Sequence, residues 1–128
     1  MQLILGGRMQ GKLAFALRLS GHSPEDVSEN WLSGEGAEKP IWNRLHLGIR
    51  QLVERGIDPQ PRLLALVEQH PAALILCDEV GSGIVPMHPL ERAYRDAVGR
   101  SCCLLAERAE RVIRVQCGIP MVLKGASL

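Results

Sequence analysis

The sequence is poor in aromatic residues: two tryptophans, one tyrosine and one phenylalanine make up 3% of its 128 positions. Proteins that hold single-stranded nucleic acid stack successive bases on aromatic side chains, and so few residues cannot form such a platform. The 15 basic and 14 acidic residues are spread along the chain and form no basic stripe. We therefore expect no nucleic-acid partner.

Long apolar runs and paired cysteines are also missing. No stretch approaches the ~20 apolar residues of a membrane span, and the first apolar run is too short for a signal peptide. The four cysteines contain no Cys-x-x-Cys pair, so their spacing matches neither a zinc site nor a disulfide framework. These absences predict a reduced, cytoplasmic protein without a membrane span, and the length predicts a single domain over residues 1–128.

A glycine-rich stretch lies near the start, where residues 3–13 read Leu-Ile-Leu-Gly-Gly-Arg-Met-Gln-Gly-Lys-Leu. The apolar run before it predicts a strand and the pattern after it predicts a helix, which is the context of a phosphate-binding loop. The glycines at the two ends, Gly6 and Gly11, permit positive φ and close approach of the backbone to phosphates, and the helix amino terminus adds partial positive charge. An ordinary glycine turn is the alternative. The predicted nucleotide-binding residues are Gly6, Gly7, Arg8, Met9, Gln10, Gly11, Lys12 and Leu13.

One position of this loop departs from the usual pattern. The motif places a Ser or Thr, whose hydroxyl binds Mg²⁺, directly after the lysine that reaches the outer phosphates. Here Leu13 follows Lys12, and a leucine cannot ligate a metal. We therefore expect ATP or GTP to bind at this loop, with Mg²⁺-assisted transfer weakened.

A second apolar segment ends in acidic residues. Residues 72–77 form a continuous apolar run, typical of a strand buried on both faces, and Asp78 and Glu79 follow it. Ligands of open parallel sheets bind at the carboxyl ends of the strands. We predict Asp78 as a Mg²⁺ ligand and Glu79 as a catalytic base. The alternative is a pair of surface carboxylates at a strand–loop junction.

Residues 41–55 predict a helix whose apolar side faces the core. A polar stripe on the same helix carries Asn43, His46 and Arg50, and the last two side chains could meet a phosphate together. A solvated polar face is the alternative. The preceding residues 31–40 are rich in Gly, Glu and Ser and predict a flexible or exposed connection.

The remaining segments continue the alternation of strands and helices. Helices are predicted over residues 58–69 and 89–111, and strands over residues 112–117 and 121–123. The sequence therefore predicts an α/β fold with a small, mostly parallel sheet covered by helices.

Four segments together form a longer pattern. They are the glycine loop at 6–13, Asp-Glu-Val-Gly-Ser-Gly-Ile-Val-Pro at 78–86, Arg-Ala-Tyr-Arg-Asp-Ala-Val-Gly at 92–99 and Gly-Ile-Pro-Met-Val-Leu-Lys at 118–124. This set resembles the adenosylcobinamide kinase / adenosylcobinamide-phosphate guanylyltransferase family of cobalamin biosynthesis. The resemblance covers the first 20 residues and everything after about residue 72, so it is far more specific than the glycine loop alone.

The resemblance implies a P-loop NTPase fold related to RecA, a trimeric assembly, and nucleotide chemistry on a corrinoid. Family members phosphorylate a hydroxyl of adenosylcobinamide and then attach GMP from GTP. The second step passes through a GMP-histidine in a His-Arg-x-x-Arg-Pro motif. The nearest counterpart here, residues 46–51, retains His46 as the catalytic residue and Arg50 as a nucleotide-binding residue, but it lacks the first arginine and the proline.

Three departures separate the chain from the family pattern. Leu13 replaces the hydroxyl residue, Asp78 replaces an asparagine, and the middle of the chain is shorter and lacks a central Asp-Cys-Leu-Thr segment. They leave open two other predictions: a non-catalytic nucleotide-binding or regulatory protein of the same fold, and a small ATPase or nucleotide kinase with a different acceptor.

Overall fold

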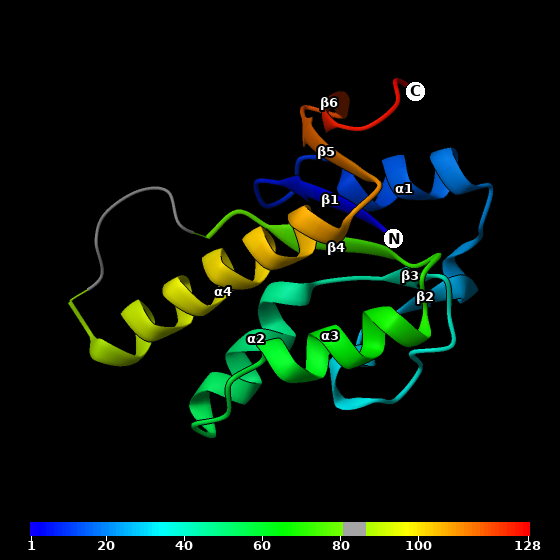
Figure 1. Cartoon of the computed structure of the whole chain (residues 1–128). Coiled ribbons are helices and arrows are strands. Elements are labelled where there is room, and N and C mark those ends of the chain that lie inside the picture. The colour runs from blue at the N-terminus through cyan, green and yellow to red at the C-terminus, as the bar shows by residue number, and fades with distance from the viewer. Residues whose placement is uncertain (81–86) are drawn as a thin grey trace.

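The computed structural model describes residues 1–80 and 87–128. Within these residues the chain alternates strands and helices (Figure 1). The elements are β1 (Gln2–Gly6), α1 (Lys12–Ser20), β2 (Val27–Ser28), β3 (Ile41–Trp42), α2 (Leu45–Glu54), α3 (Gln60–Gln69), β4 (Leu74–Asp78), α4 (Pro89–Arg108), β5 (Arg111–Gln116) and β6 (Ile119–Lys124).

The strands form one sheet in the order β2-β3-β4-β1-β5-β6. Neighbouring strands from β2 to β5 are parallel, and β6 is antiparallel to β5. This arrangement confirms the predicted α/β fold with a mostly parallel sheet. After β1 the chain continues to β2, which lies on one side of β1 in the sheet. After β4 it continues through α4 to β5, which lies on the other side of β1. The crevice for a ligand is therefore expected at the carboxyl ends of β1 and β4, where the strand order reverses.

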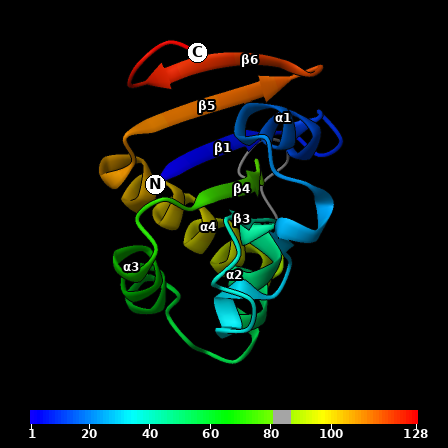
Figure 2. The ribbon, with the colours of Figure 1, turned by 90° about the vertical axis from the view of Figure 1, so that its right-hand side faces the viewer.

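Both faces of the sheet are covered by helices (Figures 1 and 2). Because successive side chains of a strand point to opposite faces, Leu3 and Ile4 of β1 belong to different cores. Leu3 packs in the larger cluster, together with residues of α2, α3 and α4. Ile4 packs in the smaller cluster with Phe15 and Ala16 of α1. The central strands are thus buried on both faces, as a parallel sheet requires.

The predicted helix over residues 41–55 is wrong in its first turn. Ile41 and Trp42 are fully buried and form β3, between β2 and β4, and α2 begins only at Leu45. The reason lies at Arg44, whose φ of 54° is left-handed and interrupts the backbone between strand and helix. The 3.6-residue pattern missed this break because a strand of two residues has no period of its own.

The prediction of an exposed connection over residues 31–40 is also wrong in part. Trp31 and Leu32 lie in a short 3-10 turn and are almost completely buried, as is Ala37. Trp31 stacks on Trp42 with ring centroids 4.4 Å apart, and its indole N–H donates to the carbonyl of Asn43 at 3.0 Å. The segment is therefore anchored by its two ends to the core beneath α2.

Among the described residues, no helix is both long and apolar enough to cross a lipid bilayer.

Candidate functional site

The loop between β1 and α1 has two left-handed positions. Gly11, directly before α1, has φ of 92°, and Met9 has φ of 58°. Gly6, whose residue type would also permit positive φ, does not adopt it. A Cβ atom on Gly6 would instead overlap the carbonyl oxygen of Val115 in β5. Gly6 is therefore required by close packing, and Gly11 by backbone conformation.

The turn between β5 and β6 holds this loop from outside. The main-chain carbonyl of Gln10 accepts the N–H of Gly118 at 2.8 Å, and its side-chain Oε1 accepts the N–H of Cys117 at 2.7 Å. A Cβ on Gly11 would lie 3.2 Å from Cα of Gly118. The shape of the glycine loop therefore depends on the carboxyl-terminal hairpin.

Lys12 and Asp78 meet at the carboxyl ends of the two central strands. The register pairs Gly6 with Asp78, so the glycine loop and the acidic residue begin at the same level of the sheet. Lys12 Nζ lies 2.7 Å from Asp78 Oδ1 and donates to the carbonyl of Gly7 at 2.8 Å. The lysine is buried, and its ammonium is held at the mouth of the loop by two oxygen atoms. Incoming phosphate oxygens could replace these contacts without moving the backbone.

His46, on the first turn of α2, packs against the same carboxylate. Its Nδ1 accepts the main-chain N–H of Asp78 at 3.2 Å, and its Nε2 lies 3.3 Å from Asp78 Oδ2. Because Nδ1 is an acceptor, the neutral ring carries its proton on Nε2. Burial lowers the pKa of His46; the carboxylate of Asp78 opposes this shift, and the charge of Lys12 reinforces it.

A cavity of about 800 Å³ lies between the glycine loop and the start of α2. Its volume falls within the range of roughly 300–1,000 Å³ that is usual for small-molecule sites. It is lined by Arg8, Met9, Gln10, Gly11, Lys12, Leu13, Ala14, Asn43, Arg44, His46, Leu47 and Asp78. The structure thus brings the predicted loop residues 8–13, His46 and Asp78 to one cavity, whereas the predicted Gly6 and Gly7 are not part of its lining.

Two further predicted site residues, Arg50 and Glu79, lie away from the cavity. Arg50 forms an ion pair with Glu91 of α4 and donates to Glu54 at 3.2 Å. Glu79 forms an ion pair with Arg114 of β5, with 2.9 Å between the closest atoms. Neither residue lines the cavity. Residues 81–86 of the predicted signature lie outside the described residues.

Arg44 is a cavity residue that the sequence analysis did not single out. Its side chain lies 3.7 Å from Glu29, which also accepts a hydrogen bond from Asn43 at 3.0 Å. A non-glycine residue in the left-handed region costs conformational energy and is enriched at functional sites. No pattern in the sequence marks it, because its conformation comes from the buried contacts of its neighbours rather than from its own residue type.

Comparison with known proteins bears on this geometry. A family model described as cobinamide kinase / cobinamide phosphate guanyltransferase matches residues 43–123, which is more than half of the chain. The chain belongs to this family. The cobinamide kinase family has a P-loop NTPase fold, in agreement with the glycine loop and sheet order described above.

Two relatives of the cobinamide kinase family match about half of this chain. The bifunctional adenosylcobalamin biosynthesis protein CobP of Pseudomonas aeruginosa is 42% identical over 67 residues, or 52% of this chain and 39% of the relative. The protein CobU of Salmonella typhimurium, which has the same description, is 40% identical over 74 residues, or 56% and 41% of the two chains. The chain therefore spans about two fifths of the length of the curated relatives it matches.

The residues around the cavity fit a magnesium ion only in company with phosphates. Asp78 supplies a single carboxylate, and Leu13 packs against the core cluster under α1 where a hydroxyl is usual. Within residues 1–80 and 87–128 no group of three or more His, Cys, Asp or Glu could hold a metal. Because Mg²⁺ commonly uses one carboxylate together with waters and phosphate oxygens, this arrangement suits a nucleotide-borne ion.

Proposed function

We propose that this protein is a nucleotide-dependent transferase that acts on a corrinoid, as a kinase for adenosylcobinamide. The observation that carries the proposal is the meeting of the glycine loop, Lys12 and Asp78 at one cavity in a chain of the cobinamide kinase family. Its relatives are described as bifunctional adenosylcobalamin biosynthesis proteins.

Binding of the nucleotide would rely on charge and main-chain dipoles. The amide groups at the start of α1 would face the phosphates, and the left-handed conformation of Gly11 would let the loop approach them closely. Lys12 would exchange the carbonyl of Gly7 for a phosphate oxygen. Arg8 and Arg44, which line the same cavity, would neutralise further negative charge. Asp78 would hold Mg²⁺ through water, and that ion would shield the phosphates when bound.

Phosphoryl transfer requires little covalent chemistry from the protein, so positioning and electrostatics dominate. The acceptor hydroxyl oxygen would form a bond to the γ-phosphorus while the bond to the β–γ bridging oxygen breaks. The nucleoside diphosphate leaves with that electron pair, and the hydroxyl proton goes to Asp78. Among the lining residues of the cavity Asp78 is the carboxylate, whereas Glu79 lies outside that lining.

The geometry favours phosphate binding over nucleophilic attack by His46. A nitrogen that attacks phosphorus needs a free lone pair, and Nδ1 of His46 already accepts a main-chain hydrogen bond. Its Nε2 carries a proton and is a donor, which suits a phosphate oxygen. A guanylyl group on His46 would require the contact with Asp78 to break first.

The decisive experiment is calorimetric titration of ATP and GTP into wild type and Lys12→Ala. We expect the substitution to weaken binding at least 100-fold, because the lysine supplies a charge-assisted contact to the phosphates. Arg18→Ala, on the exposed side of α1, is the matched control. Equal affinity in wild type and Lys12→Ala would exclude the loop as the nucleotide site.

The chemistry is tested by incubation with nucleotide and adenosylcobinamide. Turnover at an ordinary enzymatic rate, on the order of 1 s⁻¹ or above, supports the kinase. Labelled GTP distinguishes the two steps: a covalent label that appears in wild type and is lost in His46→Ala would establish the guanylyl intermediate and contradict the binding role of His46.

A second candidate is a nucleotide-binding protein without catalysis. Leu13 favours it, because the residue that usually ligates Mg²⁺ is here part of the apolar packing under α1. Tight nucleotide binding that is independent of Mg²⁺, with no turnover of adenosylcobinamide, would support this reading. Leu13→Ser distinguishes the two candidates more sharply. If the loop at residues 6–13 otherwise binds phosphates as an enzyme does, the restored hydroxyl should make nucleotide binding more dependent on Mg²⁺.

A further inference from the structure

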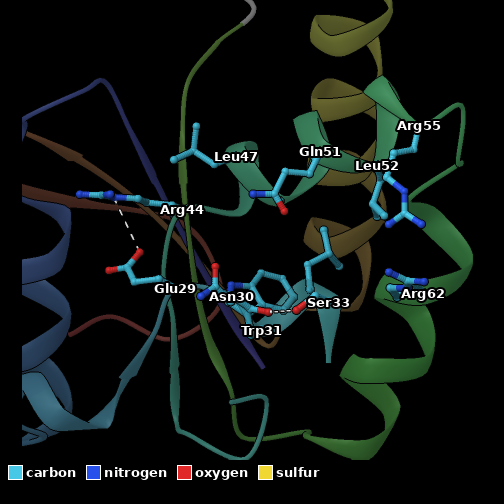
Figure 3. A pocket seen from close by; sticks show the side chains of 12 residues that line it. Glu29, Asn30, Trp31, Ser33, Arg44, Leu47, Gln51, Leu52, Arg55 and Arg62 are labelled. Atoms are coloured by element: carbon cyan, nitrogen blue, oxygen red, sulfur yellow. Dashed lines mark hydrogen bonds and ion pairs between the residues drawn. The ribbon is translucent and has the colours of Figure 1, made fainter. Parts of the chain in front are cut away.

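A second, smaller cavity lies beside the first. It has a volume of about 180 Å³ and shares Arg44 and Leu47 with the larger cavity. Its walls come from the 3-10 turn at Trp31–Ser33, from α2 and from α3 (Figure 3). A Cβ atom on Gly48 would lie 2.9 Å from the side chain of Leu32, so α2 packs directly on the turn. The cavity therefore lies where α2 packs on the buried Trp31 and Leu32 of the turn.

Two arginines, Arg55 and Arg62, border this cavity. Arg55 directly follows α2, and Arg62 lies in the first turn of α3. Figure 3 shows both side chains at one end of the cavity, whereas Glu29 lies at the other end against Arg44. In the part of the chain that the structure describes, neither Arg55 nor Arg62 forms an ion pair.

The backbone between the two arginines is short and hydrogen-bonded. Gly56 donates its N–H to Val53 at 2.9 Å, and Ile57 donates to Leu52 at 2.9 Å. The turn thus fixes the end of one helix relative to the start of the next. Two positive groups held beside the same cavity repel each other, and an anion placed between them would offset that repulsion. The amide of Gln51, which also lines the cavity, offers a further hydrogen-bond donor.

We propose that this cavity is a subsite for a phosphomonoester, bound by Arg55 and Arg62 while nucleotide phosphates occupy the larger cavity. Planar guanidinium groups bind phosphate oxygens through paired N–H donors, which suits a group with three such oxygens. The cavity is smaller than sites that enclose a whole ligand, so it takes the charged group and leaves the rest of the molecule outside.

The identity of this ligand rests on the proposed function. A phosphorylated alcohol is what the proposed transfer produces, and the subsite would hold that group beside the nucleotide through the shared wall at Arg44 and Leu47. The anion site itself depends only on the two arginines, so the two proposals can fail separately.

The test is titration of inorganic phosphate into Lys12→Ala, in which the glycine loop has lost its lysine. We expect phosphate to bind this variant, and each of Arg55→Gln and Arg62→Gln, added to it, to weaken the affinity roughly tenfold. Arg108→Gln, at the exposed end of α4, is the matched control. No phosphate binding to Lys12→Ala, or binding that both arginine substitutions leave unchanged, overturns the subsite.

A second measurement covers the case in which Lys12→Ala does not fold. Wild type and Arg55→Gln/Arg62→Gln, with Lys12 intact, are titrated with phosphate, and the double substitution should remove one binding site while nucleotide affinity stays the same. An equal number of phosphate sites in both proteins overturns the subsite. If wild type binds no nucleotide but still binds phosphate at the two arginines, the proposed function alone is overturned.

Discussion

Two segments face each other across the larger cavity and are built in opposite ways. The loop at residues 6–12 presents main-chain amides and one lysine, and glycines determine its shape. The segment at residues 43–46 presents side chains, and buried neighbours determine its shape: Asn43 donates its N–H to Ser28 at 2.9 Å and accepts the indole N–H of Trp31 at 3.0 Å. A site made of main-chain amides requires glycines at fixed positions and can be recognised in the sequence. A site made of side chains that tertiary contacts hold in place has no such sequence motif.

The difference has a consequence for substitution. The loop should be sensitive to any added atom at its base, and the facing segment should be sensitive to the loss of a buried partner. Four measurements separate these two behaviours, and they are taken from the largest expected effect to the smallest.

The largest effect is expected at the base of the loop. In Gly6→Ala the new methyl group would overlap the carbonyl of Val115, so β5 must move, and we expect a loss of roughly 3 kcal/mol of unfolding free energy. Gly7→Ala is the matched control, because its nearest neighbour, Gln10 Cγ, lies at an ordinary 3.4 Å. Urea denaturation of both variants measures the difference, and equal losses would contradict this account of Gly6.

The second measurement removes the buried indole N–H of Trp31, which holds the segment at residues 43–46. Trp31→Phe preserves an aromatic ring near Trp42 but leaves the carbonyl of Asn43 without the indole N–H. An unsatisfied buried acceptor costs on the order of 2 kcal/mol, so we expect a loss of that size in urea denaturation. Nucleotide affinity should fall as well, because Asn43 and Arg44 line the cavity. Unchanged affinity would show that the segment is irrelevant to binding.

A smaller effect is expected where the hairpin meets the loop. Gln10→Ala removes the acceptor of the Cys117 N–H, a hydrogen bond near the surface, and should cost about 1 kcal/mol of unfolding free energy. Gln69→Ala, an exposed glutamine at the end of α3, is a control for the side-chain loss. If Gln10→Ala weakens nucleotide binding without changing stability, the contact acts on the loop conformation alone.

The smallest effect concerns pH. The pKa of His46 is lowered chiefly by burial, so below the ordinary histidine pKa the unfolded chain binds a proton that the folded chain does not. Stability should therefore fall as the pH drops from neutral through the ordinary pKa toward the lowered one. In His46→Gln this decrease should be smaller than in wild type when denaturation is measured at pH 7.5 and 5.5. An equal pH dependence in the two proteins would contradict it, with exposed His22→Gln as the comparison.

The sequence predicted the elements whose patterns are long or chemically distinctive. The strand, loop and helix at the start and the buried strand before Asp78 follow from glycine spacing and a continuous apolar run. The missed elements, β2 and β3, are two residues each and owe their existence to pairing with β4 and with each other. Trp31 was assigned to an exposed connection because its neighbours are polar or glycine, and its burial depends on a stacking partner eleven positions away in the chain.

The site residues also divide into those that a sequence pattern predicted and those whose place depends on tertiary contacts. Lys12, His46 and Asp78 converge because each lies at the end of an element that the sequence signals. Arg50, predicted from its helical spacing to His46, faces α4 instead, where Glu91 pairs with it and the guanidinium lies 4.9 Å from the centre of the Tyr94 ring. Helical spacing identifies residues on a shared face, but the partner that this face meets comes from the tertiary fold.

The hydrogen bonds from the β5–β6 turn to Gln10 have a consequence for the synthesis of the protein. The contact joins positions 107 residues apart, so the glycine loop leaves the ribosome well before the turn that holds its shape. A nascent chain that ends before the β5–β6 turn carries the whole glycine motif and still lacks the brace that shapes it. Competence to capture an anion should thus arise only when the turn emerges and closes over the loop.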